Sequence, residues 1–245
     1  MVAFAILGAI VGSFIGAAVL RAPRGESIIE GRSHCDSCGQ TLRAADLVPL
    51  LSFAWLKGRC RYCHTHIAVD QPVAELGGCL VGIMAAVSAS TVAGCMLWAV
   101  FGWTLVALGL LDARHFWLPD ALTLPLMALG LAAAVFSPEI ALVDRLLGAL
   151  CGYGVLEVLR RGYRRFSGRD GMGAGDSKLF AAIGAWLGLA MLPWILLLAA
   201  SLGLALVGYR AARGRPPSRL DRLPFGTFLA AAAVLLLPLS TALSG

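Results

Sequence analysis

Charged residues are scarce in this sequence. Asp, Glu, Lys and Arg make up 14% of its 245 residues, whereas apolar residues make up 59% and the mean hydropathy is +0.81. A typical soluble domain is roughly 45–50% apolar and about 25% charged, so the composition argues against a soluble globular domain and a disordered chain. The net charge of +6 does not point to nucleic acid. In so apolar a chain, excess Lys and Arg are typical of the cytoplasmic loops of a membrane protein.

The first apolar stretch lacks charge altogether. Residues 2–20 contain no Asp, Glu, Lys or Arg, and Arg21 follows them. A secretory signal peptide begins with basic residues, and none precede this stretch. At about 1.5 Å per residue the stretch is long enough to cross a hydrocarbon core of roughly 30 Å. We therefore expect residues 1–20 to form a first transmembrane helix.

Further stretches without charge predict the other helices. Residues 76–111 and 179–209 are each too long for a single span. We expect the first to fold back at the polar residues 88–91, and the second to break at Pro193, because proline removes a backbone donor. The remaining predicted spans are residues 121–138, 144–159 and 223–245. The sequence thus predicts an all-α polytopic membrane protein with about eight transmembrane helices.

The basic residues predict the orientation of this bundle. Of the 20 Lys and Arg residues, all but Arg145 fall on one side of the predicted helices. Because cytoplasmic loops carry an excess of Lys and Arg, that side is expected to be cytoplasmic. The protein is then a multi-pass membrane protein with both termini on the outer side. The basic side comprises residues 21–61, Arg114, residues 160–178 and residues 210–222.

One long polar segment, residues 21–71, interrupts the apolar sequence. It separates the first helix, residues 1–20, from an expected bundle of seven helices over residues 72–245. The segment contains two C-x-x-C pairs separated by 21 residues. Each pair can point two thiolates at one ion, and two pairs complete a tetrahedral zinc site with no open position for substrate. The expected ligands of this structural zinc ion are Cys35, Cys38, Cys60 and Cys63.

The cysteine count of seven is odd, which argues against a secreted disulfide framework and for a reducing compartment. Four unligated cysteines in a polar loop remain an alternative to the zinc site. We expect the nearby His34, His64 and His66 to be solvated loop residues. The cysteines that fall inside predicted spans are expected to be small packing residues; they are Cys79, Cys95 and Cys151.

Acidic residues at membrane depth are expensive and commonly functional. Glu75, Asp112 and Asp176 qualify, and both aspartates lie at the predicted cytoplasmic end of a span. Two neighbouring carboxyl groups share a proton, so one can act as general base on water and the other as acid on a carbonyl. This is the chemistry of an aspartic protease. Gly173 and Gly175 precede Asp176 and would allow a backbone strand to approach closely.

Structural roles for the same residues stay open. Asp176 fits the N-cap of a helix, where aspartate is favoured. Asp112 can pair with Arg114 or cap a loop. Asp120 follows Pro119 at a predicted helix start and is expected to be a cap.

Motifs spread over nearly the whole chain form a recognisable set. They are Gly12-Ser-Phe14, the two cysteine pairs, Pro72-Val-Ala-Glu75, Asp112 with Pro119 seven residues later, and Gly173-Ala-Gly-Asp176. Together they resemble the bacterial type IV prepilin leader peptidase/N-methyltransferase family, which consists of eight-helix aspartic membrane proteases with a G-x-G-D signature.

The resemblance implies two activities. The first is cleavage of the leader of type IV prepilins or pseudopilins on the cytoplasmic side, for a type IV pilus or a type II secretion system. Asp112 and Asp176 match the catalytic pair, with Gly173 and Gly175 as the supporting motif. The second is methylation of the new N-terminus with S-adenosylmethionine, for which Gly58 is a candidate residue. The implied partners are these substrates and the lipid bilayer, without nucleic acid.

Two other functions remain as alternatives. One is a zinc-ribbon membrane assembly factor without enzymatic activity, in which the aspartates are caps. The other is a proton-coupled transporter, in which the aspartates carry protons. A transporter often shows a repeat between its halves, and this sequence has no evident one.

Overall fold

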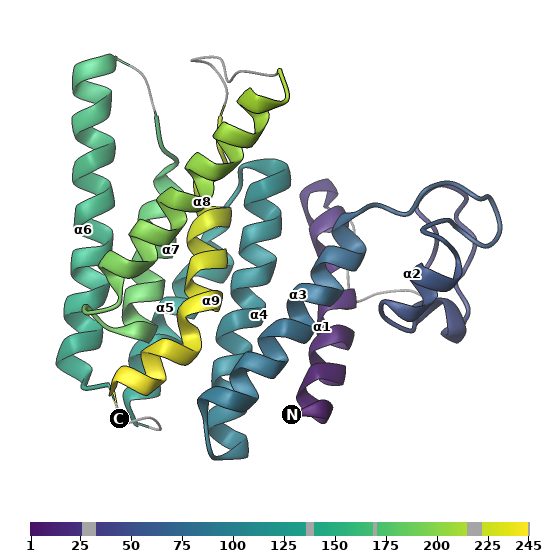
Figure 1. Cartoon of the computed structure of the whole chain (residues 1–245), viewed down its shortest axis with the longest axis horizontal. Coiled ribbons are helices and arrows are strands. Elements are labelled where there is room, and N and C mark those ends of the chain that lie inside the picture. The colour runs from purple at the N-terminus through teal and green to yellow at the C-terminus, as the bar shows by residue number, and fades with distance from the viewer. Residues whose placement is uncertain (26–32, 136–139, 169–170, 215–221, 245) are drawn as a thin grey trace.

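The structure is a computed structural model that describes residues 1–25, 33–135, 140–168, 171–214 and 222–244. Long helices run up and down through one bundle, and a small insert lies at its side (Figure 1). The long helices are α1 (Val2–Arg21), α3 (Asp70–Ser88), α4 (Val92–His115), α5 (Asp120–Ala132), α6 (Leu142–Ser167), α7 (Ala174–Leu187), α8 (Leu192–Ala212) and α9 (Phe225–Ser244). The shorter elements are η1 (Ala22–Arg24), η2 (Ala44–Leu47), α2 (Leu51–Trp55) and η3 (Ala133–Val135).

Both long apolar stretches are divided into two helices, the first at the predicted turn and the second at residues 188–191, a few residues before the predicted break at Pro193. Residues 89–91 separate α3 from α4, where the Thr91 Oγ1 accepts a hydrogen bond from the Gly94 N–H at 3.1 Å. Pro193 lies in the first turn of α8, where its missing N–H costs no helical hydrogen bond. Charge-free length was therefore a sound guide to where the chain turns.

Several predicted helix ends are wrong. The predicted span 144–159 is part of α6, which continues to Ser167, and the predicted span 121–138 gives way at Ala132 to the short η3. Charge is costly only within hydrocarbon, so a helix can extend past the membrane edge. In α6 the Glu157 carboxylate pairs with Arg160 and Arg161, both at 2.7 Å, and such pairs support a helix outside the membrane.

Four helices are long and apolar enough to cross a membrane: α1, α3, α4 and α8. Shorter apolar helices lie at Asp120–Val135 and Phe225–Leu239. Among the described residues, α6 and α7 do not meet these limits of length and composition. Length and composition thus support four of the predicted spans.

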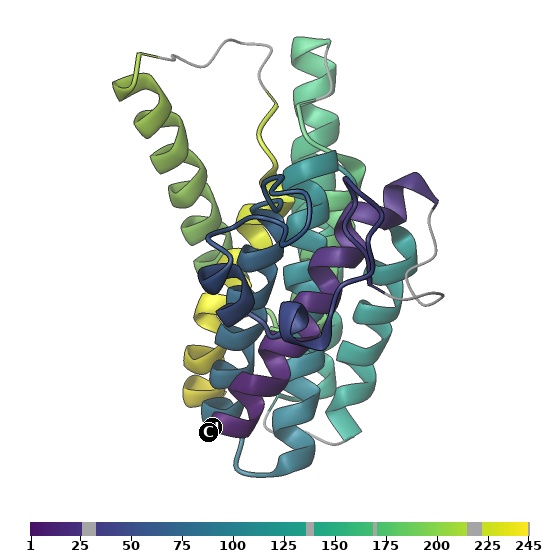
Figure 2. The same ribbon diagram turned by 90° about the vertical axis from the view of Figure 1, so that its right-hand side faces the viewer.

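The basic residues at the helix ends gather at one end of the bundle. The basic ends of α1, α4, α6 and α8 lie at one end of the bundle, and both chain termini lie at the other (Figures 1 and 2). Arg145, in the first turn of α6, lies at the end with the termini. Four residues of the predicted basic side fall outside the described residues: Arg32, Arg169, Arg215 and Arg219.

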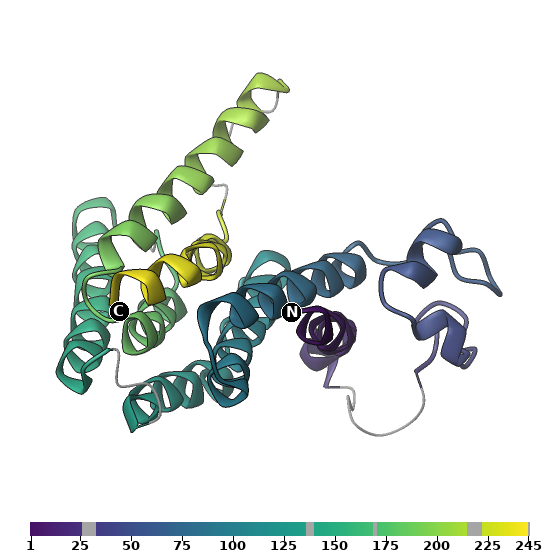
Figure 3. The same cartoon turned by 60° about the horizontal axis from the view of Figure 1, so that its bottom comes forward.

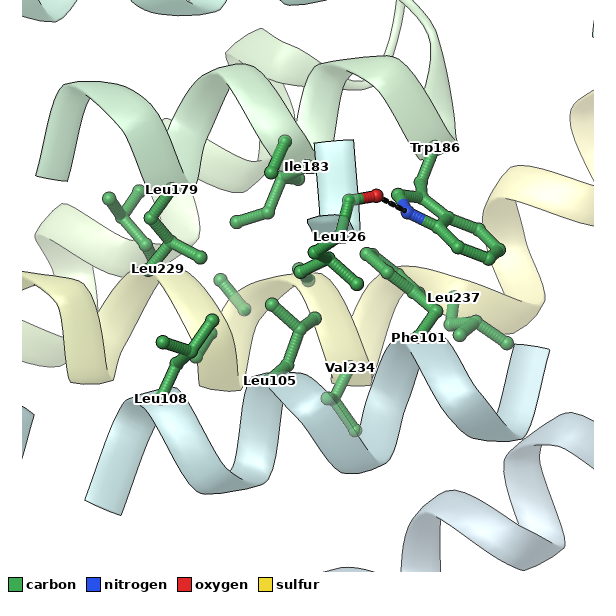
Figure 4. Packing of buried hydrophobic residues seen from close by; sticks show 14 of the residues in the cluster. Phe101, Leu105, Leu108, Leu126, Leu179, Ile183, Trp186, Leu229, Val234 and Leu237 are labelled. Carbon is green, nitrogen blue, oxygen red and sulfur yellow. Dashed lines mark hydrogen bonds between the residues drawn. The ribbon is translucent and has the colours of Figure 1, made fainter. Parts of the chain in front are cut away.

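The core of the bundle packs α4, α7 and α9 together with α5 (Figure 4). Trp186 of α7 stacks on Phe101 of α4 with ring centroids 4.7 Å apart, and its Nε1 donates to the Leu126 carbonyl at 2.7 Å. Glycines let neighbouring helices approach at backbone distance: a Cβ at Gly184 would collide with the backbone at Gly148. Small residues at helix contacts are typical of membrane bundles.

The insert lies to one side of the bundle, next to α1 and α3 (Figure 3). Glu75 is buried near the start of α3, and its carboxylate accepts the Leu50 N–H at 2.7 Å and the Gln71 Nε2–H at 3.1 Å. The Glu75 carboxylate therefore links the insert to the bundle, and these hydrogen bonds account for its burial.

Candidate active site and candidate metal centre

Asp112 lies one turn before the C-terminus of α4 and is buried. Its Oδ2 accepts hydrogen bonds from the Thr227 N–H at 2.8 Å and from the Thr227 hydroxyl at 3.2 Å. The same hydroxyl lies 2.8 Å from the Gly109 carbonyl. Asp112 is thus held by the first turn of α9, a segment 115 residues away in the sequence.

Asp176 lies in the first turn of α7 and is also buried. Its Oδ2 accepts the Gly173 N–H at 3.1 Å. This bond satisfies one of the backbone donors that a helix leaves free at its N-terminus. The N-cap residue of α7 is Gly173, so Asp176 is not the N-cap that the sequence left open; it lies at the third helical position, and its hydrogen bond back to Gly173 fixes the direction of its side chain.

The structure brings Asp112 and Asp176 together at the basic end of the bundle. The charge of Asp112 acts on Asp176, and the Gly226 backbone N–H interacts with both carboxyl groups. Two carboxyl groups that act on each other in this way are costly to ionise together. A pair of this kind is equipped for general acid and general base catalysis on one substrate.

The alternative partners of these acids are engaged elsewhere. Arg114 forms an ion pair with Asp70 rather than with Asp112. The prediction that Asp120 caps a helix is wrong: α5 begins at Asp120 itself, no side-chain cap is formed, and Asp120 binds Lys178 at 2.7 Å. That ion pair joins the first turns of α5 and α7.

The two glycines before Asp176 have different surroundings. A Cβ at Gly175 would lie 2.7 Å from the Leu118 Cβ, which is closer than side chains pack. A Cβ at Gly173 would lie 3.4 Å from the Asp176 Oδ2, an ordinary contact. The space beside Gly175 is therefore filled by the protein's own Leu118 rather than left open for another backbone strand.

Sequence reasoning missed the residues that connect the aspartates. Gly226 and Thr227 stand in the segment Pro224-Phe-Gly-Thr227, just where the last apolar helix begins. A proline followed by a glycine and a hydroxyl residue at a helix start was the available signal. Nothing in the sequence linked this segment to Asp112.

The four cysteines of the insert come together as their spacing predicts. Their Sγ atoms all lie within 4.8 Å of one another, and those of Cys35 and Cys63 are 3.9 Å apart. Thiolates bound at about 2.3 Å to a tetrahedral zinc ion lie about 3.8 Å from each other. Donor type and spacing therefore fit a zinc ion held by all four, Cys35, Cys38, Cys60 and Cys63.

Two similar turns present the cysteine pairs. In each turn the residue after the second cysteine has a left-handed backbone, with φ of 70° at Gly39 and 56° at His64. Arg61 of the second turn binds Asp46 at 2.7 Å, and its guanidinium holds the pKa of Asp46 below its usual value. The bridges that close the turns pair His34 with Thr41 and Arg59 with His66.

The other candidate residues of the insert lie around this cluster. His34, His64 and His66 are not part of the four-cysteine group. Gly58 has a left-handed φ of 70°, and a Cβ there would lie 3.0 Å from the Phe53 ring, so a structural reason exists for this glycine. A cavity of about 680 Å³ lies beside the cluster; its lining includes Trp55, Lys57, Arg59 and His66.

Comparison with known proteins agrees with the motifs. Residues 6–89 match the bacterial peptidase A24 N-terminal domain, and residues 99–208 match the type IV leader peptidase family. No solved structure gives a significant match.

Several curated proteins are similar over most of the chain, and each is named prepilin leader peptidase/N-methyltransferase. That of Aeromonas salmonicida strain A449 is 39% identical over 82% of this chain and 69% of its own length. That of Pseudomonas putida is 35% identical over 93% of this chain and 86% of its own. That of Burkholderia pseudomallei strain K96243 is 38% identical over 94% and 82%. The chain therefore belongs to the type IV leader peptidase family.

Proposed function

We propose that this protein is an aspartic endopeptidase of the inner membrane that removes the leader of type IV prepilins or pseudopilins on the cytoplasmic side. The observation that carries the proposal is the meeting of Asp112 and Asp176, both buried, at the basic end of the bundle. The names of the relatives supply the substrate class.

The chemistry requires one carboxylate and one protonated carboxyl group. The carboxylate takes a proton from water as the water oxygen bonds to the scissile carbonyl carbon, and the other group protonates the carbonyl oxygen. When the C–N bond then breaks, the first group returns its proton to the leaving amine. The second recovers a proton from a hydroxyl of the intermediate. Both groups end as they began.

We further propose that all eight long helices belong to the membrane bundle, with the basic end in the cytoplasm and both termini in the periplasm. At about 1.5 Å per residue, α7 is roughly 21 Å long, shorter than a hydrocarbon core of about 30 Å. Because α7 is buried by its neighbours over most of its length, its backbone does not need to span the lipid. Its first turn then places Asp176 at the cytoplasmic edge, where water can reach it.

The second proposed activity is methylation of the new N-terminus, which the relatives' names suggest. S-adenosylmethionine would supply the methyl group. The cavity in the insert fits such a ligand in size, since small-molecule sites measure about 300–1,000 Å³. Lys57 and Arg59 would bind its carboxylate, and Trp55 would offer an aromatic face to its adenine. Gly58 lies between these residues in the sequence and would act by shaping the turn.

Cleavage of a prepilin by the purified protein tests the peptidase. We expect Asp112→Asn and Asp176→Asn each to remove nearly all activity, because either change leaves half of an acid–base pair. Asp120→Asn is the matched control: it alters a carboxyl group at the same end of the bundle that binds Lys178 and should leave most of the activity. Near-normal cleavage by a folded variant at Asp112 or Asp176 would refute the catalytic pair.

The same assay separates the alternatives. A zinc-ribbon assembly factor would not cleave the prepilin even as the wild-type protein, in which both aspartates are intact. A proton-coupled transporter would also cleave nothing, and its two asparagine variants would lose substrate transport instead.

A further inference from the structure

We propose that Thr227 is a positioning residue that keeps Asp112 as the ionised member of the pair, so that Asp176 carries the shared proton. This assignment rests on the proposed peptidase function. It makes Asp112 the general base on water and Asp176 the general acid on the scissile carbonyl oxygen.

The first argument is the set of donors around Asp112. Its Oδ2 accepts the Thr227 N–H at 2.8 Å and has the Thr227 hydroxyl at 3.2 Å. Hydrogen bonds to the charged form of a carboxyl group favour that form. In the described part of the chain, Asp176 has the Gly173 N–H at 3.1 Å and shares the Gly226 N–H, but has no hydroxyl donor. Asp112 is therefore the better stabilised anion.

The second argument is where the backbone donor comes from. Thr227 lies in the first turn of α9, and the first N–H groups of a helix have no partner within that helix. Donating to Asp112 therefore breaks no helical hydrogen bond. The N-terminus of a helix also favours a negative charge nearby, and the same turn presents the Gly226 N–H to the pair.

The third argument is that the Thr227 hydroxyl has two acceptors for one hydrogen. It lies 2.8 Å from the Gly109 carbonyl and 3.2 Å from the Asp112 Oδ2. While Asp112 is ionised, the hydroxyl can donate to it. After Asp112 has taken a proton from water, the hydroxyl can turn to Gly109 and accept a hydrogen bond from the new carboxyl group. Thr227 can thus follow both protonation states of Asp112 without moving its backbone.

Gly226 makes this close contact possible. A Cβ at Gly226 would lie 3.0 Å from the Asp112 Oδ2 and 2.9 Å from the Leu118 Cδ1. Any side chain here would push the first turn of α9 away from Asp112. The glycine and the threonine therefore act as one unit: the first permits the approach, and the second provides the donors.

The test compares three Thr227 variants in the purified full-length protein, with a prepilin substrate and a full pH–rate profile. Thr227→Val keeps the shape and the N–H but loses the hydroxyl. We expect kcat to fall about tenfold and the acidic limb of the profile to move about one pH unit upward, because the Asp112 anion is less well stabilised. KM should change little. Thr227→Ser should restore both values, and Thr227→Pro, which also removes the N–H, should shift the limb further.

Thr123→Val is the matched control. Thr123 is buried in the first turn of α5, and its hydroxyl donates to the carbonyl of Pro119, the residue just before that helix, at 3.2 Å. An unchanged acidic limb in Thr227→Val would overturn the proposal, as would equal losses in the Val and Ser variants. Full activity in Asp112→Asn would instead refute the peptidase mechanism itself, so the two failures are distinguishable.

Discussion

At the scale of single residues, the signature around Asp176 contains two glycines whose roles differ. Neither Gly173 nor Gly175 has a positive φ, so neither position requires glycine for its backbone conformation. Position 175 requires glycine for steric reasons, because Leu118 occupies the space that a side chain would need. Gly173 contributes its N–H to Asp176, a contact that any residue except proline can make.

This difference predicts unequal effects of the same substitution. Gly175→Ala places a methyl group 2.7 Å from the Leu118 Cβ, so the first turn of α7 must shift and Asp176 must shift with it. A misplacement of about 1 Å can cost on the order of 100-fold in rate. We expect Gly175→Ala to lower the rate of prepilin cleavage at least tenfold by this mechanism, with folding and zinc content preserved.

Gly173→Ala is the control, and its cleavage rate should stay within about threefold of the wild-type rate, since 3.4 Å is an ordinary contact and its backbone N–H is retained. Equal rates for the two alanine variants would mean that the close packing of Leu118 does not position Asp176.

At the scale of elements, Arg145 shows what the sequence could and could not reveal. Charge patterning marked it as the one basic residue away from the rest. The structure shows that it is fully buried and donates to the carbonyls of Gly130 at 3.0 Å and Trp186 at 3.1 Å. These carbonyls belong to the last turns of α5 and α7, which lack partners within their helices. One side chain thus supplies hydrogen-bond donors to the C-terminal carbonyls of two helices. This role depends on a contact between residues 41 positions apart in the sequence.

The aspartate pair shows the same limit. The sequence predicted that Asp112 and Asp176 lie at the same end of the bundle, because both border charge-free stretches. It did not predict Thr227, since α4 and α9 become neighbours only through the packing of the whole bundle. Local patterns therefore located the acids, whereas the groups that orient them came from distant segments.

The insert is the element for which the sequence was most informative, because both cysteine pairs are local motifs. We predict about one zinc ion per chain. The double variant Cys60→Ser/Cys63→Ser should lose it, as measured by metal analysis of the purified protein. Because the binding energy of a structural zinc site is local folding energy, proteolysis should then cut the insert and leave the bundle intact.

The control for zinc is the double variant Cys79→Ser/Cys151→Ser. These cysteines lie on α3 and α6, away from the four-cysteine group, and the zinc content should not change. A fully active wild-type preparation without zinc, with all four insert thiols freely titratable, would contradict the structural metal.

At the scale of the whole molecule, the basic helix ends and the aspartate pair share one end of the bundle, and the two termini share the other (Figure 2). Because Lys and Arg are retained on the cytoplasmic side, this arrangement predicts that the leader is cut in the cytoplasm and that both termini lie in the periplasm. The prediction is tested with reporter fusions in a bacterial host. A fluorescent protein fused after Arg213, at the basic end of α8, should fold in the cytoplasm and fluoresce.

Alkaline phosphatase fused after the last residue should be active, because this enzyme folds only in the oxidising periplasm. The reciprocal fusions should be silent, which controls for expression of each reporter.

Odd and even numbers of spans place the C-terminus on opposite sides, so the pair of reporters also tests whether α9 crosses the membrane. If both positions report the cytoplasm, α9 does not cross. If both report reversed sides, the aspartate pair faces the periplasm, and cleavage of a cytoplasmic leader by Asp112 and Asp176 is ruled out.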